Sequence, residues 1–108
     1  MLNKQPNSNH RNPFAQTCWF MNDHHAWLCV PRELLKRFNL ESKVSTFSYQ
    51  TIHPDGTPIV FLEEDCDANL IIHSIGLELF KNAHDKGWIK DHKIPNSFFT
   101  ERCEGYRN

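Results

Sequence analysis

The turn sequence His-Pro-Asp-Gly-Thr-Pro at residues 53–58 constrains the fold of this 108-residue chain more than any other segment. Pro54 presets one backbone angle of a turn, and the Asp55-Gly56 pair accepts the left-handed conformation that tight turns need. A run rich in β-forming residues precedes the turn at 44–52, and an apolar run follows it at 59–62. The sequence therefore predicts a β-hairpin here.

A second hairpin and a short helix are predicted before that turn. Two aromatic-rich runs between residues 14 and 30 flank a polar break at 22–25, which is typical of a hairpin. Pro31 suits the first position of a helix because it lacks the N–H that would go unbonded there. Leucines and a phenylalanine then recur at helical spacing, and Asn39 is a reasonable stop for the helix.

The second half of the chain predicts one main helix. Apolar residues recur at helical spacing between Ala68 and Ala83. Gly76 is expected to bend or weaken this helix, at a cost of about 1 kcal/mol relative to alanine, and Gly87 is expected to end it. A last strand is expected around Ser97–Cys103.

Together these elements predict an α+β fold: an antiparallel sheet of four or five strands, with the main helix packed on it and the short helix between the hairpins. Residues 14–108 are expected to form a single domain, since the chain is too short for two cores. Residues 1–13 are polar, with two prolines and four asparagines, and are expected to be a disordered tail.

Charge and cysteine content narrow the class of protein. The net charge is −1, with residues 1–50 at +3 and residues 51–108 at −4, so general affinity for nucleic acid or an anionic membrane is not implied. The chain opens without the apolar core of a signal peptide, and no apolar run approaches a membrane span. We therefore expect four free thiols, a cytoplasmic location and no membrane partner.

No catalytic, metal or cofactor signature is present among the titratable residues. The adjacent His24 and His25 would point to opposite faces of a strand, and His73 lacks a companion at metal-ligand spacing. Cys66 would gain reactivity at a helix start, but the neighbouring carboxylates should raise its thiol pKa. We expect no catalytic residue, no metal and no cofactor, which favours a non-enzymatic protein without closing the question. Whether the histidines and the acidic run converge stays open.

The acidic run before the main helix is the most unusual segment. Its carboxylates complement the N–H groups at a helix start, and we expect them to point into solvent. An acidic surface suits a basic protein partner, so we interpret the run as a partner-binding patch. Its members are Glu63, Glu64, Asp65 and Asp67.

Three segments resemble a set of small uncharacterised bacterial and mobile-element proteins. They read His25-Ala26-Trp27-Leu28-x-Val30-Pro31, Ser45-x-Phe47-Ser48-Tyr49 and Leu62-Glu63-Glu64-Asp65-Cys66-Asp67-Ala68. That group has no assigned function. The resemblance implies an accessory or host-defence-modulating protein of a phage or plasmid.

Residues 26–44 also resemble the AbrB-type swapped-hairpin regulators and antitoxins, through Val30-Pro31-Arg32-Glu33-Leu34, Phe38-Asn39-Leu40 and Lys43-Val44. Asn39 replaces the family's usual glycine, and its Pro-Gly-Asp turn is absent. The resemblance implies an alternative function, a dimeric DNA-binding regulator or antitoxin. Independently of it, a metal-binding protein is a third hypothesis. The oligomeric state stays open. The DNA-binding residues would be Arg32, Lys36, Arg37 and Lys43.

Overall fold

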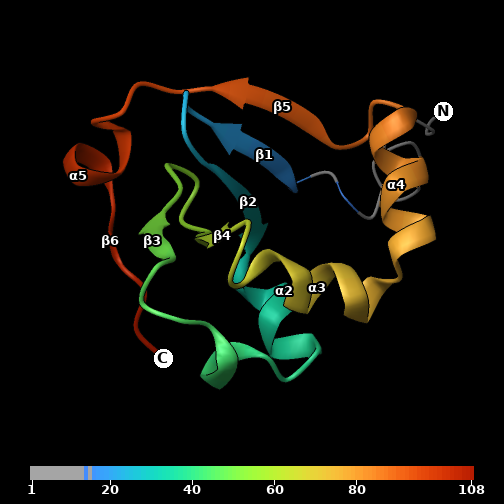
Figure 1. Ribbon diagram of the computed structural model, residues 1–108. Helices are drawn as coiled ribbons and strands as arrows, with labels where there is room; N and C mark the ends of the chain where they lie inside the picture. The colour runs from blue at the N-terminus through green and yellow to red at the C-terminus, as the bar shows by residue number, and fades with distance from the viewer. Residues whose placement is uncertain (1–13, 15) are drawn as a thin grey trace, which may run out of the picture.

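The computed structural model describes residue 14 and residues 16–108, so the predicted tail at 1–13 lies outside the described residues. The strands are β1 (Cys18–Met21), β2 (Ala26–Pro31), β3 (Tyr49–Ile52), β4 (Pro58–Glu63), β5 (Lys90–Lys93) and β6 (Glu104–Gly105). The helices are α2 (Arg32–Arg37), α3 (Ala68–Ile75), α4 (Leu77–Asp85) and α5 (Phe98–Arg102), with a 3-10 turn, η1, at Glu41–Lys43. They form an α+β fold around one six-stranded sheet in the order β5-β1-β2-β4-β3-β6 (Figure 1).

Both predicted hairpins are confirmed. Strands β1 and β2 pair antiparallel around the polar break at 22–25, and β3 and β4 pair antiparallel around the predicted turn. In that turn the N–H of His53 donates to the carbonyl of Thr57 at 2.8 Å, and Gly56 takes a φ of 94°. Strand β3 is shorter than predicted, because residues 44–48 are not in a strand.

The expected antiparallel sheet of four or five strands is in fact a mixed sheet of six strands. Strand β5 runs parallel to β1 at one edge, and the short β6 pairs with β3 at the other. All four residues of β5 are exposed and polar, so no apolar alternation marks it as a strand. Its position depends on pairing with β1 instead of on a buried face of its own.

The strand expected around Ser97–Cys103 is wrong, because helix α5 occupies that segment. Consecutive residues of a strand point to opposite faces, whereas one helical turn can place two neighbouring phenylalanines against the same surface. Phe98 and Phe99 both pack on the sheet in this way. The chain returns to extended structure only at Glu104, where β6 begins.

Two predicted helix ends are confirmed by backbone conformation. Asn39 has a φ of 59° just after α2, and Gly87 has a φ of 79° just after α4. Gly76 has a φ of 114° and separates α3 from α4, so the single main helix expected from the sequence is two helices. Pro31 is the last residue of β2 and precedes α2, one position before its expected place.

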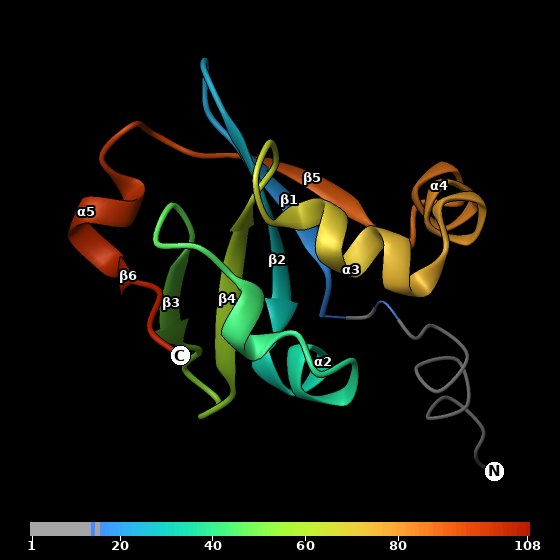
Figure 2. The same cartoon turned by 60° about the horizontal axis from the view of Figure 1, so that its bottom comes forward.

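The sheet has a core on each face. In one core, every second residue of β2 and β4 packs against helices α2, α3 and α4. The other joins the opposite residues of the same strands to α5, so Figure 2 shows α2, α3 and α4 on one side of the sheet and α5 on the other. The second core is aromatic and contains Trp27, Phe61 and Phe99.

Two general expectations can be compared with the described residues. Among them, no helix has both the length and the apolar character that crossing a membrane would require. The four cysteines are free thiols, as expected.

Candidate functional site

The acidic run forms a tight turn that leads from β4 to α3. Glu63 ends β4, and its Oε1 atom accepts hydrogen bonds from the N–H groups of Asp65 at 2.8 Å and Cys66 at 3.0 Å. Glu64 bonds the neighbouring hairpin, since its N–H donates to the carbonyl of Ala26 at 3.0 Å and its Oε1 accepts from the Ala26 N–H at 3.2 Å. These bonds fix the turn against β2.

Asp67 anchors a different segment of the chain. Both of its carboxylate oxygens lie 3.1 Å from the N–H of Ser45, and Oδ2 also accepts from the Ser45 hydroxyl at 2.7 Å. The Ser48 hydroxyl donates to the same Oδ2 atom. Hydrogen bonds to an ionised acceptor are shorter and stronger than neutral ones. Asp67 therefore holds the segment before β3 against the start of α3.

The expectation that all four carboxylates point into solvent is wrong for two of them. Glu63 is 8% exposed and Asp67 is 2% exposed. A buried carboxylate is tolerated when its oxygens are hydrogen-bonded, and both side chains have partners close by. The acidic surface is therefore limited to Glu64, which is half-buried, and Asp65, which is exposed.

Ser48 connects the acidic turn to the C-terminal segment. Its hydroxyl accepts from the N–H of Glu63 at 3.0 Å, and its carbonyl accepts from the N–H of Tyr106 at 2.9 Å. Within the segment, the N–H of Phe47 donates to the Ser45 hydroxyl at 3.2 Å. Residues 45–48, which we call the Phe47 loop, are thus fastened to the acidic turn and to the C-terminal segment.

The Phe47 loop carries an exposed aromatic side chain at its tip. Phe47 is 66% exposed, more than any other large apolar residue that the structure describes. Ser45, two residues before it, and Ser48, directly after it, are held by hydrogen bonds to Asp67. The fold therefore presents Phe47 from a fixed backbone. Alternation of residue types had suggested a strand here, and no local signal marked a loop whose anchor lies at Asp67.

The three segments that carry the resemblance to mobile-element proteins lie together in space. The Phe47 loop bonds the acidic turn, as described. His25 Nδ1 lies 3.8 Å from Glu63 Oε2, and the rings of Trp27 and Tyr49 lie 6.3 Å apart. Most of the quoted residues therefore lie close together around the start of β2 and the end of β4, whereas Val30 and Pro31 lie toward the other end of β2.

The histidines considered in the sequence do not join this region as a metal site. His24 and His25 are exposed in the β1–β2 turn, where Asn22 Oδ1 accepts from both of their backbone N–H groups at 2.9 and 2.8 Å. His73 is exposed on α3. Across residues 14 and 16–108, no three His, Cys, Asp or Glu side chains are arranged to hold a metal ion.

Cys66 lies in the acidic turn and is exposed. Its thiol pKa is raised, mainly by desolvation and further by the hydrogen bond to Glu63 and the nearby negative charges. A raised pKa lowers the thiolate fraction near neutral pH, and the thiolate is the nucleophile. The direction agrees with the inert interpretation made from the sequence.

The four residues proposed for DNA binding in the alternative function differ in how they are used in the structure. The Arg32 guanidinium donates to Glu41 Oε2 at 2.6 Å, to Gln50 Oε1 at 3.0 Å and to the carbonyl of Arg107 at 2.9 Å. It also stacks over Tyr106 at 4.9 Å. The guanidinium of Arg32 is therefore already bonded to other residues of the protein. Three further residues of that set are exposed: Lys36, Arg37 and Lys43.

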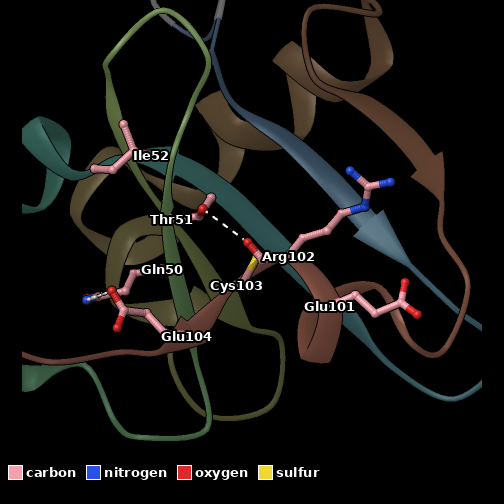
Figure 3. Close-up of a pocket in the computed structure, with 7 residues that line it drawn as sticks. All are labelled: Gln50, Thr51, Ile52, Glu101, Arg102, Cys103 and Glu104. Carbon is pink, nitrogen blue, oxygen red and sulfur yellow. Dashed lines mark hydrogen bonds between the residues drawn. The ribbon is translucent and has the colours of Figure 1, made fainter.

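A shallow pocket of about 350 Å³ lies between β3 and the α5–β6 segment (Figure 3). The Thr51 hydroxyl donates to the carbonyl of Arg102 at 3.2 Å across it. The charged ends of Arg102 and Glu101 point away from Thr51 in Figure 3, so no charged groups converge in it. The lining residues are Gln50, Thr51, Ile52, Glu101, Arg102, Cys103 and Glu104.

An apolar groove of about 250 Å³ separates α2 from the α3–α4 junction. Its wall includes the partly exposed Phe38 and Leu79, which is 58% exposed. Arg37 supplies the charge in its lining. The groove lies on the face of the sheet that α2, α3 and α4 cover. It is lined by Phe14, Leu34, Arg37, Phe38, Ser74, Ile75 and Leu79.

No protein-family model matches the chain, and comparisons with curated proteins and with solved structures find no match either.

Proposed function

We propose that this chain is a non-enzymatic binding protein that captures one protein partner through the Phe47 loop and the adjoining acidic turn. The observation that carries the proposal is the fixed display of Phe47. A buried aspartate and two serines hold a loop whose central side chain is 66% exposed. Phe47 itself adds little to folding, because its side chain stays in water.

A fixed aromatic side chain is well suited to anchor an interface. Ordering a loop on binding costs free energy, and a loop ordered beforehand avoids that cost. Aromatic anchors that fill a partner's pocket often supply much of the binding energy. The Phe47 loop combines the two properties, since its backbone is bonded to Asp67 and its ring is free to enter a pocket.

The charge beside the loop favours a basic partner. Asp65 is exposed in the acidic turn that bonds the loop, and Glu64 is half-buried next to it. Residues 51–108 carry a net charge of −4. Complementary charge mainly raises the rate of association and makes it dependent on salt. We therefore expect an apolar pocket with a basic rim on the partner.

The cellular role we propose rests on the resemblance alone. The region that holds the Phe47 loop is the region by which the chain resembles small bacterial and mobile-element proteins. We propose that the partner is a host protein and that the chain is an accessory or host-defence-modulating protein of a phage or plasmid, acting in the cytoplasm.

Site-specific photo-crosslinking tests the surface. The photoreactive residue p-benzoylphenylalanine is placed at position 47, and in matched controls at positions 52 and 88, where Ile52 is 61% exposed and Trp88 is 37% exposed. Each protein is irradiated in a bacterial lysate. We expect a partner that crosslinks from position 47 only, and a partner that crosslinks equally from all three positions contradicts the proposal.

Calorimetry with the purified partner then tests the energetics. We expect Phe47→Ala to weaken binding by about tenfold or more, while Ile52→Ala binds like wild type. Glu64→Gln with Asp65→Asn should slow association and reduce its salt dependence. Binding of Phe47→Ala within twofold of wild type would remove the loop from the interface.

A further inference from the structure

Two cysteines lie directly opposite each other in the sheet. Cys18 of β1 pairs with Cys29 of β2 in the antiparallel register. Both side chains belong to the aromatic core on the face that α5 covers. Cys29 is 5% exposed and Cys18 is half-buried. The hairpin that was predicted from its aromatic runs therefore also aligns two thiols.

The backbone already satisfies the distance that a disulfide requires. Directly opposite residues of an antiparallel pair have Cα atoms about 4.5–5.5 Å apart. Disulfides form over Cα separations of about 4.4–6.8 Å. The two thiols are close enough for each to shift the pKa of the other. A bond between them needs rotation of side chains but no new strand register.

The pair is chemically unequal. The hydrogen bond from Cys29 lowers the pKa of Cys18, although burial opposes this shift. The pKa of Cys29 is raised by the same hydrogen bond and by burial. The hydrogen bond between them therefore favours the thiolate at Cys18 over the thiolate at Cys29. Such a division provides one nucleophile and one resolving thiol.

A cavity gives small molecules access to the pair. It has a volume of about 250 Å³ and lies between the β1–β2 strands and the β3–β4 turn. This volume far exceeds the roughly 30 Å³ that one water molecule takes in the liquid, so a molecule as small as hydrogen peroxide fits. The cavity is lined by Gln16, Cys18, Phe20, Cys29, His53, Thr57 and Ile59.

We propose that Cys18 and Cys29 form a dithiol site that hydroperoxides oxidise to a disulfide across the β1–β2 hairpin. The Cys18 thiolate attacks one peroxide oxygen, the O–O bond breaks, and the leaving hydroxide takes up a proton to become water. Cys18 is then a sulfenic acid. The Cys29 sulfur attacks the Cys18 sulfur, the S–O bond breaks, and a second water leaves with the Cys29 proton. Both sulfurs are oxidised and the peroxide is reduced.

The remaining cysteines serve as internal references. Cys66 is exposed but lies away from the pair in the acidic turn, with a raised pKa. Cys103 packs in the same aromatic core, and burial raises its pKa to about 11. Both should react slowly with peroxide, although Cys66 is the more accessible of the two. If exposure alone set the reactivity, Cys66 would react with peroxide faster than Cys18 and Cys29, which is the opposite of what we expect.

Peptide mapping of the full chain tests the site. Reduced protein is treated with hydrogen peroxide, the remaining thiols are alkylated, and each cysteine is quantified by mass spectrometry without reduction. We expect Cys18 and Cys29 to lose their free thiols together, at least about tenfold faster than Cys66. The peptide that contains both should lose two hydrogens. Faster oxidation of Cys66, or a disulfide between Cys29 and Cys103, overturns the proposal.

Variants separate the two roles. Cys29→Ser should leave a sulfenic acid at Cys18 that dimedone traps, and Cys18→Ser should abolish rapid oxidation of Cys29. Cys66→Ser should oxidise like wild type. Circular dichroism verifies that each variant is folded, and Cys18→Ala replaces Cys18→Ser if the serine variant is not. Rapid oxidation of Cys29 in a folded Cys18 variant contradicts the assignment of the nucleophile.

Discussion

The Ser48 hydroxyl donates a hydrogen bond to the Asp67 carboxylate and accepts one from the N–H of Glu63. This single side chain joins the segment before β3 to both ends of the acidic turn. Its position explains part of the burial of the Asp67 carboxylate, whose oxygens accept from the Phe47 loop. It also fastens the loop that presents Phe47 to the acidic turn.

Asp67→Asn should destabilise the protein by about 2–4 kcal/mol, because an amide offers one acceptor oxygen and turns an N–H group toward donors. Urea unfolding followed by circular dichroism measures the change. Asp65→Asn is the matched control, and it should unfold like wild type because Asp65 is exposed. Equal stability of the two variants would show that the buried carboxylate does not hold the Phe47 loop.

Gly76→Ala should destabilise the protein by about 1–3 kcal/mol, because alanine rarely adopts a positive φ. Gly76 has a φ of 114°, and a Cβ atom there would meet no atom within 4 Å, so strain is the sole direct cost. Gly105→Ala is the control, since that site is equally open and lacks a positive φ. Thermal unfolding should show a lower midpoint for Gly76→Ala alone. Similar losses of stability at both sites would contradict the idea that the positive φ of Gly76 is what disfavours alanine between α3 and α4.

Phe99→Ala should cost about 3–5 kcal/mol of stability, the range for deletion of a buried phenylalanine. Phe99 is 4% exposed, stacks on Tyr49 with ring centroids 4.5 Å apart, and lies 4.4 Å from the Trp27 ring. Phe47→Ala removes the same side chain from an exposed position and should leave the free energy of unfolding nearly unchanged. Denaturant unfolding of both variants compares them. A small effect of Phe99→Ala would show that α5 does not cover the sheet.

Tyr106→Phe should change how the free energy of unfolding depends on pH in the alkaline range. Burial is the main cause that raises the pKa of Tyr106, and the charges of Glu41 and Asp67 add to it against the lowering effect of Arg32. The fold therefore prefers the neutral phenol, which also donates to the Glu41 carbonyl at 2.6 Å. This stability is complete below the unfolded pKa, about 10, and is lost as pH rises through the folded value.

The measurement is the free energy of unfolding of wild type and Tyr106→Phe at several pH values between neutral and strongly alkaline. Wild type should be more stable at neutral pH by about 1 kcal/mol, the net value of a typical hydrogen bond. The difference should shrink above the unfolded pKa, because phenylalanine does not titrate. A difference that stays constant with pH would contradict the assigned role of the phenol.

Local chemistry in the sequence determined the hairpins and the helix ends. The Asp55-Gly56 turn, Asn39 and Gly87 each act through the conformations that their own backbones accept, so a few residues suffice to predict them. The break at Gly76 follows the same rule. These features need no information from distant parts of the chain.

Tertiary structure alone decided where the edge strand and the last helix form and which carboxylates of the acidic run are buried. Strand β5 is polar and exposed, so its identity comes from hydrogen bonds to β1. Helix α5 forms where Phe98 and Phe99 can cover one face of the sheet. Glu63 and Asp67 are buried because donors from their own turn and from the Phe47 loop reach them. For Asp67 those donors lie about twenty residues earlier, and sequence periodicity does not encode contacts over such separations.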